Sequence, residues 1–239
     1  MAVSPDAMAL MKSAVDRSKR RSTVQLPVAF MRSVSERDAP PLARLLSGGR
    51  GGEVRLRLYL TLVMQATRAP HTLPARTGAG YARLLDLDQP AGARRVAQAL
   101  KWLTANELIS RSARVGKTDE ITVLDPGGSG DEWGPVGSRW VTVPIDFWSG
   151  GWILELSARA VAVYLLLREL TGGSKDPVGE FMAGHRKRQY GMSDDTWTRA
   201  TKELVAAGPL QIVIEPVGDD EHVARVRRRY SLPSIPPLY

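Results

Sequence analysis

Apolar residues recur at helical spacing in three segments of the first half of the chain and in three matching segments of the second half. They predict helices over residues 53–68, 81–87 and 91–105, and again over 156–170, 180–190 and 194–207. Residues 108–114 and 120–124 are β-like, as are 210–216 and 224–232, and each pair predicts a hairpin. Ser193 is the expected N-cap of the last helix, because two acidic residues follow it. Each half therefore predicts three helices followed by a hairpin.

The two halves also resemble each other in sequence at a constant offset. The run VQLPVAF, which begins at Val24, aligns with VTVPIDF, which begins at Val141. In each run a short β-like stretch meets a proline and then an aromatic residue. A second match joins the segment that begins at Leu100 to the one that begins at Thr201, in the same order along the chain. We infer a tandem repeat.

Glycine and proline are concentrated between the halves, over residues 126–139, where no periodic apolar pattern is present. The predicted organisation is a flexible basic N-terminal arm over 1–22, a first domain over 23–125, this linker over 126–139, and a second domain over 140–239. The expected fold class is α+β and mainly helical. Each domain is expected to have three helices, a hairpin and a short preceding strand.

The 239 residues include 33 Lys and Arg against 25 Asp and Glu, which gives a net charge of +8 and a pI near 10.0. A basic balance favours a polyanionic partner. Residues 1–50 hold nine Lys or Arg against four Asp or Glu, so much of the excess lies in the N-terminal arm. The chain has no Cys and three His, which argues against disulfides, metal sites and cofactors. The apolar runs are too short to span a bilayer, so we expect a cytoplasmic protein without membrane contact.

No residue pattern indicates an enzyme. Gly116-Lys117-Thr118 resembles the end of a phosphate-binding loop, but Arg111 stands where that loop needs glycine, and the segment joins two strands. The glycine-rich stretch over residues 48–52 is interpreted as a flexible connector rather than a phosphate cradle. The carboxylates cluster in turns without the separated pairing that acid–base or two-metal chemistry requires.

Two resemblances to known proteins follow from these segments. Residues 84–109 and 190–214 resemble winged helix-turn-helix DNA-binding domains, although Glu107 stands where such domains usually have a turn glycine. The segment VPIDFW from Val143, with the run LSARAVAVYLLLR from Leu156, is similar to the opening of bacterial plasmid replication initiators. The resemblance implies a tandem winged-helix protein in which two such units bind one DNA site.

The candidate DNA-binding residues lie on the third helix of each half and on its surroundings. In the first half they are Arg94, Arg95, Gln98 and Lys101 on the helix, with Lys117 at the hairpin tip. In the second half they are Thr196, Arg199 and Lys202 on the helix, Arg186, Lys187 and Arg188 before it, and Arg225, Arg227 and Arg229 on the final strand. Lys19, Arg20 and Arg21 in the arm are expected to contact phosphates. Arg and Gln can pair bidentately with guanine and adenine, which points to base readout in the major groove.

The sequence predicts a protein that binds double-stranded DNA sequence-specifically and catalyses no reaction. The expected role is replication initiation on a plasmid or mobile element. Two alternatives stay open: a transcriptional regulator, most simply a repressor, and a winged-helix module that binds proteins. The acidic start of the helix at Asp194 suits the second alternative. A homodimer or multimer on repeated DNA sites is also left open.

Overall fold

The structure is a computed structural model that describes residues 3–33, 38–88, 90–114, 117–134, 139–172, 179–217 and 225–233. About 51% of the chain is helical and 19% is strand, and all sheets are small and antiparallel. The expected α+β, mainly helical class is confirmed. The same series of elements is present twice along the chain.

The first series follows an N-terminal helix, α1 (Pro5–Ser18). It consists of β1 (Thr23–Pro27), α2 (Val28–Met31), α3 (Pro41–Leu46), the 3-10 turn η1 (Gly49–Gly51), α4 (Gly52–Gln65), β2 (Thr72–Leu73), α5 (Gly78–Leu84), α6 (Ala91–Ala105), β3 (Ile109–Arg114) and β4 (Lys117–Val123). The strands β2, β4 and β3 form one sheet in that order.

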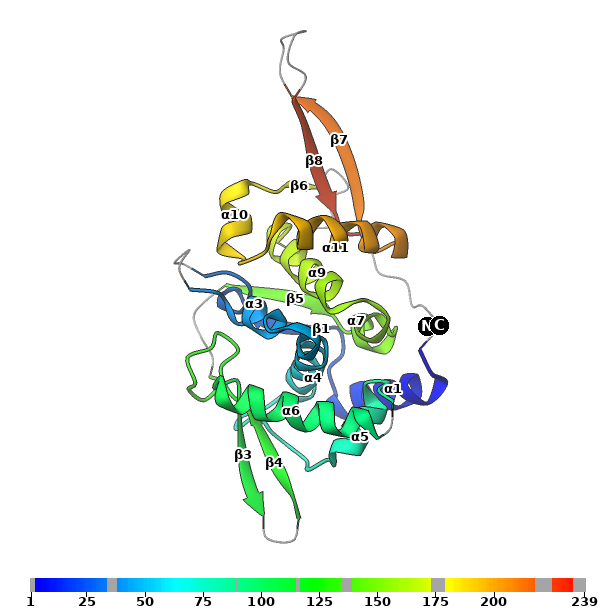
Figure 1. Ribbon diagram of the computed structural model, residues 1–239, viewed down its shortest axis with the longest axis vertical. Coiled ribbons are helices and arrows are strands. Elements are labelled where there is room, and N and C mark those ends of the chain that lie inside the picture. Colours follow the sequence, from blue (N-terminus) through cyan, green and yellow to red (C-terminus); the bar gives the residue numbers. More distant parts are fainter. Residues whose placement is uncertain are drawn as a thin grey trace.

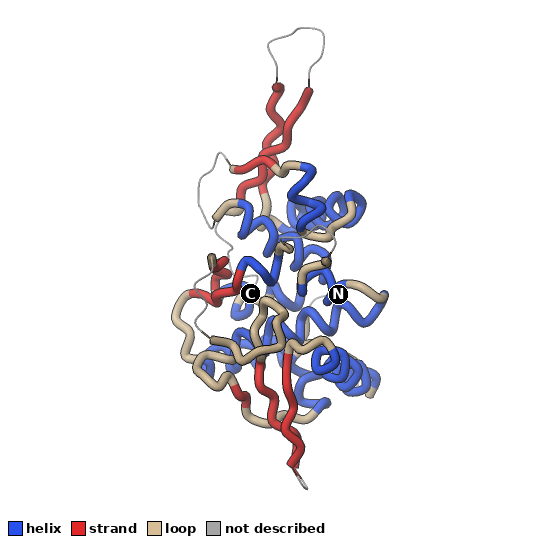
Figure 2. The backbone as a smooth tube through the Cα atoms, turned by 90° about the vertical axis from the view of Figure 1, so that its left-hand side faces the viewer, coloured by secondary structure: helices blue, strands red, loops and turns tan. Residues whose placement is uncertain are grey.

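The second series repeats this order without the 3-10 turn. It consists of β5 (Trp140–Pro144), α7 (Asp146–Ser149), α8 (Trp152–Glu155), α9 (Ala158–Leu170), β6 (Glu180–Phe181), α10 (Gly184–Gln189), α11 (Asp194–Ala207), β7 (Gln211–Val217) and β8 (Arg225–Ser231). The strands β6, β8 and β7 form a sheet whose order matches that of the first series. The hairpins β3–β4 and β7–β8 extend from opposite ends of the molecule (Figures 1 and 2).

The two series meet at their first strands, which pair with each other at the centre of the molecule (Figure 1). β1 and β5 are antiparallel, with Val24 opposite Val143 and Leu26 opposite Val141. In the sequence alignment Val24 corresponds to Val141 and Leu26 to Val143, so exchanging the halves turns one pair into the other. The pairing therefore has the symmetry of a two-fold axis that passes between Gln25 and its partner Thr142.

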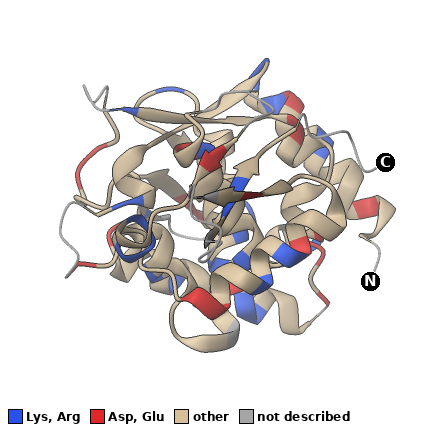
Figure 3. Ribbon diagram, turned by 90° about the horizontal axis from the view of Figure 1, so that it is seen from above, with Lys and Arg blue, Asp and Glu red and all other residues tan. Residues whose placement is uncertain are grey.

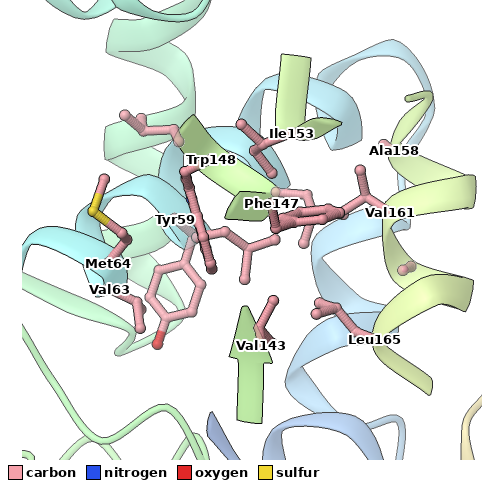
Figure 4. Packing of buried hydrophobic residues seen from close by; sticks show 14 of the residues in the cluster. Tyr59, Val63, Met64, Val143, Phe147, Trp148, Ile153, Ala158, Val161 and Leu165 are labelled. Atoms are coloured by element: carbon pink, nitrogen blue, oxygen red, sulfur yellow. The ribbon is translucent and has the colours of Figure 1, made fainter. Parts of the chain in front are cut away.

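The core surrounds this strand pair and includes residues from both series. Phe147 stacks on Tyr164 with ring centroids 4.9 Å apart, and Tyr59 lies near Phe30 at 5.7 Å. Tyr59 of the first series and Phe147 and Trp148 of the second belong to the same cluster (Figure 4). Helices α4 and α9 are buried on nearly all sides, which is why their sequences are apolar with little amphipathic periodicity. The hydrophobic core is thus continuous between the halves.

The expected flexible arm is wrong for residues 5–18, which form helix α1. Ser4 caps it by accepting a hydrogen bond from the Ala7 amide at 3.2 Å, and Pro5 occupies the first turn. Ala7, Met11 and Ala14 recur at helical spacing and are buried where α1 packs on α5 and α7. Of the basic residues in this segment, Lys12 and Arg17 lie on the exposed face of the helix, whereas Lys19, Arg20 and Arg21 follow its end.

Most of the other predicted elements are present. The helices expected at 91–105 and 194–207 have those bounds, and Ser193 caps the second, accepting from the Thr196 amide at 3.2 Å. The helix predicted over 180–190 is wrong in its first part, because residues 180–181 add a short strand to the second sheet and the helix begins at Gly184.

Candidate nucleic-acid interface

Helix α6 is amphipathic, and its apolar side fixes which residues face solvent. Val96, Ala99, Leu100 and Leu103 are buried against α4 and α5. The opposite side is exposed and carries the four residues predicted to read bases, which are Arg94, Arg95, Gln98 and Lys101. The structure therefore brings these four residues together on one exposed helical face.

This face of α6 is positively charged and contains no acidic residue, because the sequence of α6 has neither Asp nor Glu. Among the described residues, no carboxylate lies within ion-pair distance of Arg94, Arg95 or Lys101. Basic residues elsewhere do have such partners, for example Arg83 with Asp6 at 3.1 Å. Unpaired cations on one helical face form a site that can accept anions without first breaking an ion pair.

Helix α11 has the same position in the second series, but the two acidic residues at its start form ion pairs with basic residues. Arg199 donates to Asp195 at 2.9 Å, and Lys187 of α10 donates to Asp194 at 2.7 Å. The hydrogen bond and charge of Lys187 lower the pKa of Asp194 below its ordinary value, so this carboxylate stays ionised. Lys202 is exposed, as expected. Acidic and basic residues are interspersed when the molecule is seen from the end that carries the β7–β8 hairpin (Figure 3).

The third helices of the two series, α6 and α11, lie on the same side of the molecule (Figures 1 and 2). The glycine-rich turn η1 lies between them and is separated from each helix by a groove. A groove of about 600 Å³ separates the turn from α6, and Arg95 and Gln98 line it. A second groove of about 860 Å³ lies between the turn and α11, and Arg199 lines it. Gly48 and Gly51 line the first groove, and Gly49 and Gly52 the second.

The glycine-rich segment is therefore not the flexible connector that the sequence suggests. At Gly52 a side-chain Cβ would lie 2.8 Å from the carbonyl oxygen of Leu46, which only glycine avoids. The end of α3 and the start of α4 approach each other closely, which explains why glycine is needed at position 52. The same contact holds the turn η1 between α6 and α11.

The second hairpin places the predicted Arg227 and Arg229 together on one face. Arg227 and Arg229 lie over the Phe181 ring, at 5.6 and 4.1 Å from its centroid. Arg229 also donates to Glu215 at 2.8 Å. Arg228 pairs with Ile214 on the opposite face, as strand alternation requires. The side chains of Lys117 and Arg225 lie outside the described residues.

The remaining candidates lie on α10 and after α1. On α10, Arg188 is exposed, whereas Arg186 and Lys187 are half-buried. Lys19 and Arg21 are exposed, but Arg20 is half-buried and donates to the carbonyl oxygens of Met64 at 2.7 Å and Ala66 at 2.9 Å.

These acceptors are carbonyl groups at the end of α4 that have no partner within the helix. Arg20 thus closes a buried helix C-terminus, where a cation is favourable. Lys19 and Arg20 line a separate pocket of about 370 Å³, which shares no residue with the two grooves beside α6 and α11.

Sequence reasoning missed Arg55, which forms one wall of the groove beside α6. Its guanidinium lies 4.4 Å from the centroid of Trp102 of α6 and donates to the Ser47 carbonyl. Arg55 is only 7% exposed, and burial lowers its pKa. The available signal was the pair of arginines, Arg55 and Arg57, within an otherwise apolar helix, since such residues are seldom buried without a specific contact.

Comparison with known proteins finds no family model and no curated protein that the chain matches. In the part of the chain that the structure describes, no helix has the length and apolar character needed to cross a membrane. Within the same residues, His, Asp and Glu form no group of three that could hold a metal ion.

Proposed function

We propose that this protein binds double-stranded DNA sequence-specifically and that each series of elements is a winged helix-turn-helix unit. The repeated order supports this proposal: three helices, the last two joined by a short turn, precede a hairpin in both halves. In such a unit the third helix enters the major groove and the hairpin reaches the neighbouring backbone.

The observation that carries the proposal is the unpaired basic face of α6. The helix has 15 residues and is about 22 Å long, which suits insertion into the major groove. Arg94, Arg95 and Gln98 are the side chains in this unit that can read base edges, and Lys101 adds a phosphate contact. Because no carboxylate among the described residues pairs with Arg94, Arg95 or Lys101, these cations can contact DNA without first losing an ion pair.

We further propose that α11 contributes less to DNA affinity than α6 does. Arg199 must leave Asp195 before it can contact DNA, and Asp194 and Asp195 repel phosphates at the start of the helix. Both helices lie on one side of the molecule, so a single chain can contact two successive parts of one site.

The proposed biological role is initiation of replication on a plasmid or mobile element, in line with the resemblance of residues 143–168 to plasmid initiators. A transcriptional regulator would bind DNA in the same way. The two roles are distinguished by the arrangement of natural sites: direct repeats beside an origin indicate initiation, and a palindrome over a promoter indicates regulation.

The test measures affinity of the full chain for a random duplex across a salt series. We expect a linear fall of log affinity with log salt concentration. We also expect a shallower slope for the double variant Arg94→Ala/Arg95→Ala, because on a duplex without the specific site these cations contact phosphates, and each lost phosphate contact reduces the slope by about 0.9. The matched control Lys12→Ala/Arg17→Ala removes the same charge from the exposed face of α1. Affinity that is independent of salt, or equal losses in the two double variants, would refute the proposal.

A further inference from the structure

The second hairpin exposes more large apolar side chains than any other pair of strands among the described residues. Val213 and Ile214 of β7 are 47% and 60% exposed, and Val226 of β8 is 64% exposed. β7 is the outer strand of its sheet, since the order is β6-β8-β7. The hairpin projects away from the helices, so this edge is open to another molecule (Figure 1). An exposed apolar edge strand is a template for further strand pairing.

The first hairpin is an internal control, because it has the same topology and a protected edge. Its outer strand β3 exposes Ser110, Arg111 and Ser112, and a bulge interrupts its pairing between Ser112 and Arg114. Polar residues and bulges are the features by which proteins prevent edge pairing. β7 pairs with β8 in unbroken register, and its central residues Ile212, Val213 and Ile214 are apolar. The two hairpins therefore differ in their outer strands, β3 and β7, with which a partner strand would pair.

The sequence of β7 is self-complementary, as pairing with a second copy of the same strand requires. Residues 211–215 read Gln-Ile-Val-Ile-Glu, which is the same pattern in both directions: polar, Ile, Val, Ile, polar. In an antiparallel pair of two copies centred on Val213, each Ile212 lies opposite Ile214 of the other copy. Gln211 then lies opposite Glu215. A two-fold interface requires such self-complementarity, whereas a different partner does not.

Charge and proline positions fit the same register. Glu215 is the only charged residue of β7, and Arg229 already neutralises it at 2.8 Å within the sheet. No unpaired like charges are therefore brought together at the axis. Pro216, which has no amide hydrogen to donate, falls outside the five paired residues.

We propose that β7 pairs antiparallel with β7 of a second copy, with Val213 on the two-fold axis, so that two three-stranded sheets become one continuous sheet. The interface is small, and the dimer is accordingly concentration-dependent. This proposal is independent of DNA binding, because it is argued only from the sequence, exposure and position of β7.

Sedimentation of the full chain over a concentration series tests the association. We expect a monomer–dimer equilibrium that Val213→Lys weakens by about tenfold or more, because two lysines then face each other on the axis. Ser110→Lys, at an exposed position of the other hairpin, leaves the equilibrium unchanged. A protein that stays monomeric throughout, or a dimer that Val213→Lys does not weaken, overturns the proposal and leaves the edge to a strand of a different protein.

Single-cysteine variants test the register, because the chain has no other Cys. Residues directly opposite in an antiparallel pair are about 4.5–5.5 Å apart, which permits a disulfide. Val213→Cys should therefore form a covalent dimer under mild oxidation. In Gln211→Cys the two sulfur-bearing residues are about 14 Å apart along the strands and should not cross-link. Equal cross-linking of the two variants, or none in either, contradicts the proposed register.

Discussion

Replacing Glu107 with glycine should stabilise the protein, because the residue after α6 has a left-handed backbone. Glu107 has φ +57, and the corresponding residue after α11 is Gly208 with φ +100. The left-handed region costs a residue with a side chain about 1–2 kcal/mol, and glycine adopts it freely. Glycine also has more conformational freedom in the unfolded chain, which offsets about 0.5–1 kcal/mol of that gain. We expect Glu107→Gly to raise the free energy of unfolding by about 0.5–1 kcal/mol.

Urea unfolding followed by far-UV circular dichroism measures this change. Gly208→Ala is the reciprocal variant and should destabilise by about 1 kcal/mol or more through the backbone alone, because no atom lies within 4 Å of the added Cβ. Thr104→Gly, at an exposed position inside α6, is the control for glycine itself and should cost about 1 kcal/mol. If Glu107→Gly destabilises as much as Thr104→Gly, the backbone argument is refuted.

Three further changes test individual contacts within the fold. Arg20→Ala should lower the free energy of unfolding by about 1.5–3 kcal/mol, because it leaves carbonyl groups at the end of α4 without a donor, whereas exposed Arg21→Ala should have little effect in the same urea assay. Lys187→Ala should raise the pKa of Asp194 toward its ordinary value, as measured by NMR titration. The ion pair stabilises the fold at pH values above the pKa that this carboxyl has in the unfolded chain. The stabilisation is lost as pH falls through the lower pKa of the folded state. Gly52→Ala should destabilise by at least about 1–3 kcal/mol, because its Cβ would lie 2.8 Å from a backbone oxygen, and an unchanged midpoint would contradict this.

The helices that carry the candidate site could be predicted because their signals are local. In α6 and α11 the apolar residues repeat at helical spacing, and Ser193 marks the start of the second helix. Glu107 could likewise be recognised as the residue at a glycine position, which its positive φ explains. Each of these features depends on residues within a few positions of one another.

Features that depend on distant residues could not be predicted. The sequence shows the β-like runs that begin at Val24 and Val141, but it does not show that they pair with each other. The two runs are 117 positions apart, and their pairing follows from the shared core. Arg20 was counted as a phosphate contact because nothing near it in the sequence shows that its acceptors are at the end of α4. The ion pair between Arg199 and Asp195 could be predicted, because the two residues are four positions apart on one helix. That Arg94, Arg95 and Lys101 have no ion-pair partner among the described residues could be learned only from the structure.

The most direct test of the central proposal is selection of bound sequences from a random duplex library by the full chain. The pseudo-two-fold relation of the β1–β5 pair predicts that the site bound by one chain has two half-sites in inverted orientation, while the proposed role in initiation predicts that this whole site recurs as direct repeats. The half-site contacted by α6 should be the better defined, and Arg94→Ala/Arg95→Ala should remove its sequence preference while the other half-site persists. A library that shows no enrichment, or enrichment that the double variant leaves unchanged, would contradict recognition of DNA by α6.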